Sequence, residues 1–235
     1  MEKSEANTPN ILLFRGSPRS NIYEVERWND KLDCDILNVR YAGEHQAYEY
    51  ARGFFLNHEE YDYFVIATDD IEVKPEDIEQ LKKDLSVFRF PVLSGMMNVD
   101  EPDFDDEWGN LNITMELATK DRTVRFYNWV KRRELPEKDI FEVKFAGFGL
   151  TAIRRDIIEM DGFNFASDGV FRGTGAVHGA SLDLVFCWFC HENGIPIYCD
   201  KRIDMHHWRT HGVHQVGERK PEVEYKGLNV PFGYV

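Results

Sequence analysis

The chain has 235 residues, of which 43% are hydrophobic and 14% aromatic, enough for one globular domain with a buried core. It carries 42 Asp and Glu residues against 28 Lys and Arg residues, a formal net charge of −14. This balance argues against nucleic acid or an anionic membrane as the main partner, since both attract basic proteins. Four cysteines are too few, and too clustered, for a disulfide framework in a chain of this length.

No apolar stretch approaches the roughly 20 residues that span a bilayer, and the first residues lack the apolar region of a signal peptide. We therefore expect a cytoplasmic protein without a transmembrane segment. A single domain is expected over residues 1–235, with a loose polar start at residues 1–9 and a polar tail at residues 206–235.

In the first hundred residues, short apolar runs alternate with amphipathic segments. Strands are predicted at Ile11–Phe14, Asp35–Val39, Tyr63–Ala67 and Pro91–Met96, and helices at Tyr23–Leu32, at Glu44–Asn57 and from Pro75 onward. Such an alternation is typical of an α/β fold, in which helices cross over between the strands of a parallel sheet.

The second half of the chain is less regular. Strands are predicted at Asn112–Leu117, Thr123–Val130, Pro196–Cys199 and Ile203–Met205, an apolar run at Val143–Ile153, a helix at Ser181–Asn193 and a loop at Phe163–Ala180. The loop is rich in glycine, and long loops of this kind inside a compact domain are often functional.

Two adjacent carboxylates, Asp69 and Asp70, follow the apolar run Tyr63–Ala67 directly. Ligands of α/β proteins bind at the carboxyl ends of the strands. Mg²⁺ and Mn²⁺ prefer oxygen ligands and bridge protein carboxylates to substrate phosphates. The pair therefore predicts a metal or phosphate site, with a solvated acidic turn before the Pro75 helix as the alternative.

Four local motifs occur in a recognisable order. They are Tyr50-Ala51-Arg52-Gly53 followed by Thr68-Asp69-Asp70; the segment 146–155 followed by Asp161-Gly162-Phe163; Ser181-Leu182-Asp183-Leu184; and Gly194-Ile195-Pro196-Ile197-Tyr198, running to His206. In these motifs the chain resembles the GT-A glycosyltransferases, and family 2 among them, over roughly residues 11–207.

The resemblance implies a GT-A fold, which is a Rossmann-like, mostly parallel sheet flanked by helices. It implies transfer of a sugar, with inversion, from a UDP-, GDP- or dTDP-linked donor to a glycan or another hydroxyl acceptor, with Mn²⁺ or Mg²⁺ as cofactor. The implied metal ligands are Asp70 and His206, and the implied catalytic base is Asp183. The expected donor-binding residues are Arg15, Gly16, Ser17, Arg52 and Asp69.

The chain departs from the family pattern at two positions. Thr68 stands at the first acid of the usual Asp-x-Asp motif, and Ser181 stands at the usual catalytic base. A base near the acceptor hydroxyl accelerates transfer by about 10²- to 10⁴-fold. Asp183 is the surviving acid of that motif, and Asp168 and His178 in the preceding loop are further candidates.

Two other functions fit the same residues. The departures from the family pattern suit a nucleotide-sugar-binding protein with weak or no catalysis. Acidic strand ends with a metal also suit a sugar nucleotidyltransferase, although residues 15–19, Arg-Gly-Ser-Pro-Arg, only faintly resemble the Gly-rich signature of that class.

Each candidate also has a purely structural interpretation. Arg52 fits a surface ion pair, His206 a surface histidine, and Asp183 a favourable interaction with a helix dipole, worth about 0.3–1 kcal/mol. The run Cys187-Trp188-Phe189-Cys190-His191 fits a haem or zinc pattern, but its helical periodicity favours buried core thiols.

The segment after His206 contains His207, Trp208, His211 and His214 and few aliphatic residues. It cannot bury much of itself, and we expect it to close over the donor and exclude water. The alternative is a tail that packs on the back of the domain.

Overall fold

The computed structural model describes residues 8–17, 23–99, 109–116, 129–163, 165, 182–208 and 220–232. Its strands are β1 (Ile11–Ser17), β2 (Asp35–Arg40), β3 (Tyr63–Ala67), β4 (Ile71–Glu72), β5 (Val92–Met97), β6 (Ile113–Thr114), β7 (Ile140–Val143), β8 (Phe145–Ala146), β9 (Leu150–Arg154), β10 (Ile197–His207), β11 (Glu222–Tyr225) and β12 (Leu228–Val230). Its helices are α1 (Tyr23–Glu26), α2 (Glu44–Leu56), α3 (Pro75–Phe88), α4 (Arg155–Ile158) and α5 (Leu182–Glu192), with 3-10 turns at Asn29–Lys31 and Arg132–Glu134.

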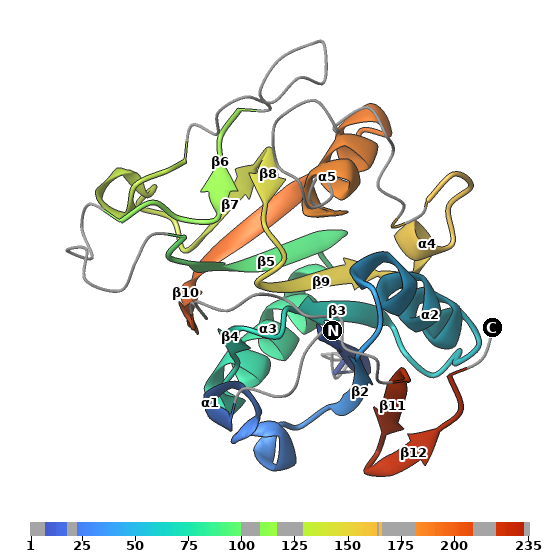
Figure 1. Ribbon diagram of the computed structural model, residues 1–235. Helices are drawn as coiled ribbons and strands as arrows, with labels where there is room; N and C mark the ends of the chain where they lie inside the picture. Colours follow the sequence, from blue (N-terminus) through green and yellow to red (C-terminus); the bar gives the residue numbers. More distant parts are fainter. Residues whose placement is uncertain are drawn as a thin grey trace, which may run out of the picture.

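One large mixed sheet forms the centre of the molecule, in the order β12-β11-β2-β1-β3-β9-β5-β10-β4, with β7 also paired to β10 (Figure 1). Strand β1 runs parallel to β2 and β3, and β5 runs parallel to β10. Strand β9 lies antiparallel between β3 and β5, so that β2, β1, β3, β5 and β10 all point the same way. The expected α/β fold, a mostly parallel sheet flanked by helices, is therefore confirmed.

A hydrophobic core lies on each face of the sheet. Helices α2, α4 and α5 cover one face, and α3 covers the other. All five residues of β3 are buried, because this strand is covered on both faces. In α2 the buried positions Ala47, Ala51, Phe54 and Phe55 are those that the helical periodicity predicts.

Helix α3 begins and ends as the sequence leads one to expect. Pro75 occupies its first turn, where a missing N–H costs nothing, and Lys74 N donates to Asp77 Oδ2 at 2.8 Å. Ile78, Leu81 and Leu85 are buried along one face. Helix α3 therefore starts about one turn after the acidic pair Asp69-Asp70.

The helix predicted at Tyr23–Leu32 is wrong in extent. Only Tyr23–Glu26 is helical, and a turn and the 3-10 segment Asn29–Lys31 follow. Two side chains in the turn, Arg27 and Trp28, reach the carboxylate of Glu72. This tertiary contact and the turn-forming Asn29-Asp30 pair outweigh the local helical pattern.

In the second half of the chain, the observed strands differ more from the predicted ones. The segments Pro196–Cys199 and Ile203–Met205 are parts of one strand, β10, whose pairing with β5 changes register between Cys199 and Asp204. Of Asn112–Leu117, Ile113–Thr114 forms a strand, which pairs with β8. Most of the predicted strand Thr123–Val130 lies outside the described residues, as does nearly all of the Gly-rich loop.

Part of the polar tail forms a hairpin that the sequence did not predict. Strands β11 and β12 pair with each other, and β11 extends the sheet antiparallel to β2. Asp35 in β2 accepts from Tyr61 Oη at 2.6 Å and pairs with Lys226 Nζ at 2.9 Å, and the Tyr225 hydroxyl contacts Tyr61. Residues 220–232 thus pack at the edge of the sheet, as the alternative interpretation of the tail has it.

Two buried carboxylates lie where α3 packs on β10. Asp84 is 4% exposed and Asp200 is fully buried, and the two share a hydrogen bond. Arg202 donates to Asp84 Oδ2 at 2.8 Å and to Asp200 Oδ1 at 2.9 Å. Burial, and then the contact with Asp200, raises the pKa of Asp84, whereas hydrogen bonds from Arg202 and Asp84 outweigh burial and lower the pKa of Asp200.

We expect Asp84 to make the stability of the protein depend on pH. A carboxyl whose pKa is raised by folding stabilises the protein at acidic pH, and that stabilisation is lost as pH rises through its folded pKa. Asp84→Asn imitates the protonated carboxyl. It should remove this loss of folding stability at higher pH, which we expect to be about 1 kcal/mol. Urea unfolding of both proteins from about pH 4 to pH 9 checks this, and parallel stability curves would contradict it.

Candidate active site

The acidic pair Asp69-Asp70 lies in the turn between β3 and β4, at the carboxyl end of the sheet. Strand β4 pairs antiparallel with the end of β10, with His206 opposite Glu72 and His207 opposite Ile71. The backbone N–H of Trp208 donates to the carbonyl oxygen of Asp70 at 2.7 Å. The end of β10 therefore fixes the turn that carries the two carboxylates.

Asp70 contacts a histidine, but not the expected one. His207 Nε2 lies 3.2 Å from Asp70 Oδ2, and Thr68 Oγ1 donates to Asp70 Oδ1 at 2.9 Å. The side chains of Asp70 and His207 keep 25% and 19% of their surface exposed. His206 is exposed and packs edge-on against the ring of Trp208, with 4.5 Å between the ring centroids. The structure thus brings His207, and not His206, to Asp70.

Glu72, which the sequence did not single out, joins three segments beside this turn. Its buried carboxylate accepts from Arg27 Nη2 at 2.5 Å, from Trp28 Nε1 at 2.8 Å and from Trp208 Nε1 at 3.2 Å. Burial alone would raise the pKa of Glu72, but these hydrogen bonds outweigh it and lower the pKa. Trp208, the expected cover of the site, is anchored here at the turn, while residues 209–219 of the expected lid lie outside the described residues.

Arg15 lies beneath the same turn. Its side chain is 3% exposed, and Nη1 donates to the carbonyl oxygen of Ile71 at 3.2 Å. Burial lowers the pKa of Arg15 to about 10, against the opposing charges of Glu26, Cys34 and Asp69. Arg15 is therefore a buried side chain that holds the backbone of Ile71, directly after the acidic pair, by a hydrogen bond.

The other residues at the end of β1 approach α2. A Cβ added to Gly16 would lie 2.8 Å from Phe14 Cζ and 3.5 Å from Ala47 Cβ, so a side chain there would displace its neighbours. Ser17 is the last residue of β1 and pairs with Arg40 in β2. The glycine thus permits the close approach of β1 to α2.

Arg52, the remaining expected donor-binding residue, takes part in helix packing. Its Nη2 donates to the carbonyl oxygen of Ile158 at 3.4 Å, and its Nη1 lies 3.8 Å from Glu49 Oε2. The guanidinium also sits 5.6 Å from the ring centroid of Phe163. These contacts join α2 to α4 and match the structural interpretation of Arg52.

Asp183 lies in the first turn of α5, where its Oδ1 accepts from the backbone N–H of Leu184 at 2.8 Å. A Cβ on Gly147 would approach Asp183 Oδ2 to 3.3 Å, so the glycine leaves room for this carboxylate. Asp183 is close enough to Glu44, at the start of α2, to raise the pKa of that residue. The other candidate bases, Asp168 and His178, lie outside the described residues, as does Ser181.

The charges of Asp183, Asp69 and Asp70 all act on Glu44 at this end of the sheet. These four carboxylates are referred to below as the acidic cluster. The Glu44 side chain is exposed, yet partial desolvation raises its pKa, and the charges of Asp183, Asp69 and Asp70 raise it further. Burial raises the pKa of Tyr48, and the charges of the same four carboxylates raise it further. Concentrated negative charge of this kind favours a bound cation.

Within the described residues, no group of three or more His, Cys, Asp or Glu side chains is arranged to hold a metal ion by itself. Asp70 and His207 nonetheless offer one oxygen and one nitrogen side by side. Mg²⁺ usually takes one or two protein ligands and completes its shell with water and substrate phosphates. The donor set therefore fits a divalent cation that arrives with a phosphorylated ligand.

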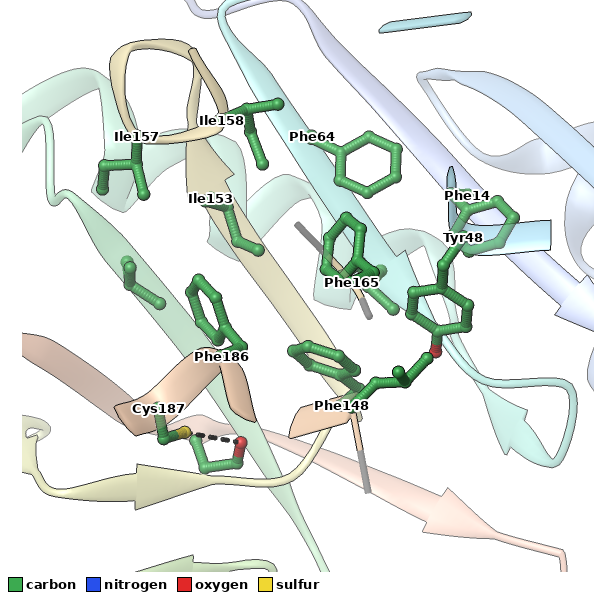
Figure 2. Close-up of a cluster of buried hydrophobic side chains, with 14 of the residues drawn as sticks. Phe14, Tyr48, Phe64, Phe148, Ile153, Ile157, Ile158, Phe165, Phe186 and Cys187 are labelled. Atoms are coloured by element: carbon green, nitrogen blue, oxygen red, sulfur yellow. Dashed lines mark hydrogen bonds between the residues drawn. The ribbon is translucent and has the colours of Figure 1, made fainter. Parts of the chain in front are cut away.

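The cysteine motif forms no metal site in the described part of the chain. Cys187, Cys190 and Cys199 are buried free thiols, and burial raises the pKa of each of them. Cys187 Sγ lies 3.7 Å from the carbonyl oxygen of Ala146, as a core thiol (Figure 2). Among the described residues, no helix is both long and apolar enough to cross a membrane.

The sequence matches no known protein family and no curated protein. Among solved structures, the chain is similar to A197 from STIV, with 16% identity, a TM-score of 0.53 and 86% of each chain covered. This similarity supports the fold alone. The inositol-1-phosphate CTP transferase from T. maritima (10% identity, TM-score 0.46, 89% of this chain and 95% of that chain) and CMP:2-keto-3-deoxy-manno-octonic acid synthetase (12%, 0.40, 82% and 89%) are also similar, at TM-scores too low to bear on function.

Proposed function

We propose that the chain is a metal-dependent glycosyltransferase, which moves a sugar from a nucleotide-diphosphate-sugar to a hydroxyl acceptor. The observation that carries the proposal is the acidic cluster at the carboxyl ends of the strands, with Asp70 directly against His207. An α/β sheet binds its ligands at this end. The cluster combines a site for a cation with a further carboxylate, Asp183, that is suited to accept a proton.

Asp70 and His207 would hold Mn²⁺ or Mg²⁺ in this proposal. The cation supplies Lewis-acid stabilisation of the negative charge that develops on the diphosphate as it leaves. Thr68 orients the Asp70 carboxylate through its hydroxyl, and Arg15 supports the following backbone at Ile71. Glu72 holds the end of β10 in place through Trp208.

Asp183 would act as the general base. In a single displacement the acceptor hydroxyl attacks the anomeric carbon while the bond to the diphosphate breaks, and the hydroxyl proton passes to the Asp183 carboxylate. Such a step inverts the anomeric configuration. Asp183 Oδ1 accepts a hydrogen bond from Leu184 N. Asp183 Oδ2 faces Gly147, which has no side chain and so leaves space beside this oxygen.

A sugar nucleotidyltransferase is the second candidate, because it would use the metal and the acidic turn in the same way. In that reaction a sugar phosphate attacks a nucleoside triphosphate, which brings further phosphates beside the four carboxylates. Transfer of a neutral sugar to a neutral hydroxyl places less negative charge there.

Thermal unfolding with a panel of ligands tests the proposal and separates the candidates. We expect stabilisation by one of UDP-, GDP- or dTDP-glucose with Mn²⁺, of roughly 2.7 kcal/mol at about 100 times the dissociation constant, and its loss with EDTA. Sugar release or transfer, followed by NMR, identifies a transferase. Stabilisation by CTP, with pyrophosphate released from CTP and a sugar phosphate, identifies the second candidate. Binding without turnover identifies a binding protein, and no stabilisation by any nucleotide contradicts all three.

A further inference from the structure

A groove of about 780 Å³ follows β2 on the face of the sheet away from α2. Alternate residues of this strand line it, because successive side chains of a strand point to opposite faces: Cys34, Ile36, Asn38 and Arg40. Glu224 lies in the neighbouring strand β11, paired with Asn38, and also lines the groove (Figure 1). The volume is within the range of about 300–1,000 Å³ that small-molecule sites occupy. The residues described along this groove include none of the acidic cluster.

The charged side chains along the groove pair with one another. Arg40 Nη1 lies 3.1 Å from Glu224 Oε2, and Arg40 Nη2 lies 3.2 Å from Glu26 Oε1. Lys226 Nζ lies 2.9 Å from Asp35 Oδ2. Both cations described along the groove are therefore held by carboxylates, which disfavours an anionic ligand such as phosphate.

Three buried polar atoms along the groove have no hydrogen-bond partner in the described part of the chain. They are Asn29 Oδ1, Asn38 Oδ1 and Arg40 Nε. Asn38 as a whole is only 7% exposed. A buried polar atom without a partner costs about 1–3 kcal/mol, and most such atoms in proteins are hydrogen-bonded. The groove therefore calls for two donors and one acceptor that a bound molecule can supply.

These atoms define the chemistry of that molecule. An ammonium group donates but does not accept, so it would leave Arg40 Nε unpaired. An amide divides the two functions between two atoms, whereas each hydroxyl both donates and accepts. The terminal torsion of asparagine is soft, so Asn29 and Asn38 can turn their oxygens toward an entering hydroxyl. Leu32 and Ile36 add apolar surface for the C–H groups of a sugar ring.

We propose that this groove binds a neutral saccharide, through hydroxyls that donate to Asn29 and Asn38 and accept from Arg40. The carboxylates along the groove accept from further hydroxyls of the same molecule. This site is separate from the acidic cluster and independent of the proposed function, since neither a nucleotide nor a metal takes part in it.

NMR titration of the isotope-labelled protein, without nucleotide or metal, tests the proposal. The saccharide probes are maltotriose, cellotriose, mannotriose and chitotriose. Spermidine, inorganic phosphate and triglycine serve as the cationic, anionic and amide probes. We expect at least one saccharide to bind and to shift the backbone amide signals of residues 36–40 and 222–226.

Asn38→Leu should lower the affinity for that saccharide about tenfold. The free energy of unfolding in urea should not fall, because the oxygen that this change removes has no partner among the described residues. Asn57→Leu is the matched control, since Asn57 is an exposed residue at the end of α2, on the other face of the sheet. It should bind the saccharide as the unaltered protein does.

Binding of no saccharide would overturn the proposal, because ordered water would then satisfy the two asparagines. Binding of spermidine, phosphate or triglycine alone would overturn it as well. Unchanged affinity in Asn38→Leu would do the same, since the saccharide would then bind elsewhere. If Asn38→Leu unfolds or loses stability, Asn29→Ala provides the second variant, and it should weaken the same saccharide. Failure of these titrations leaves the proposed function standing, because they contain no nucleotide.

Discussion

Replacing Asp70 by asparagine is expected to remove the dependence of nucleotide-sugar binding on a divalent cation. The amide keeps the shape of the side chain, and its oxygen still accepts from Thr68, which donates to Asp70 Oδ1 at 2.9 Å. The charge that attracts the cation is lost. We expect affinity measured with Mn²⁺ to fall on the order of 100-fold, about 2.7 kcal/mol. Calorimetric titrations with Mn²⁺ and with EDTA measure the difference.

Asp161→Asn is the control for loss of one carboxylate, because Asp161 is an exposed residue in the turn after α4. It should bind the nucleotide sugar as the unaltered protein does. If Asp70→Asn still binds more tightly with Mn²⁺ than with EDTA, by the same factor as the unaltered protein, Asp70 is not a metal ligand.

Local sequence patterns predict the first half of the fold well. The run Tyr63–Ala67 is apolar at every position because the strand is covered on both faces, and this requirement is visible without knowing its neighbours. The α2 face of Ala47, Ala51 and Phe54 follows from helical periodicity in the same way. Elements whose burial pattern is set by their own backbone period can be found from sequence.

Elements defined by distant partners could not be found in this way. The β11–β12 hairpin gains its place by pairing with β2, which lies far earlier in the chain, and its short strands, in which Val223 is the one buried residue, show no apolar pattern. Strand β10 contains Asp200, Lys201 and Arg202, which read as a break between two strands. The structure accommodates them by a change of register, and Asp200 is buried against Arg202 and Asp84.

In the candidate site, too, some residues follow from a local sequence pattern and others depend on distant partners. Asp70 could be predicted because it follows a buried strand directly. The choice between His206 and His207 depends on which face of β10 each occupies, and a difference of one residue reverses the face. Glu44 and Glu72 could not be predicted, because each gains its role from partners on other elements. One local feature could have pointed to Glu44 as a site residue. It is the first residue of α2, which begins just after the end of β2.

Asp183→Asn is expected to lower turnover by about 10²- to 10⁴-fold, as for loss of a general base. The variant keeps Oδ1, which accepts from Leu184 N at 2.8 Å, so α5 should start as before. Affinity for the nucleoside diphosphate should stay the same, because the diphosphate is assigned to the cation at Asp70. Steady-state kinetics together with calorimetric titration of the bare diphosphate separate the two effects.

Glu192→Gln, at the other end of the same helix, is the matched control for Asp183→Asn. It removes one carboxylate from α5 without touching the acidic cluster and should turn over normally. Near-normal turnover by Asp183→Asn would exclude Asp183 as the base. The anomeric configuration of the product, determined by NMR, would then decide the mechanism. An inverted product would require a different base, and a retained product would exclude the single displacement altogether, because that step places the acceptor on the face opposite the leaving diphosphate.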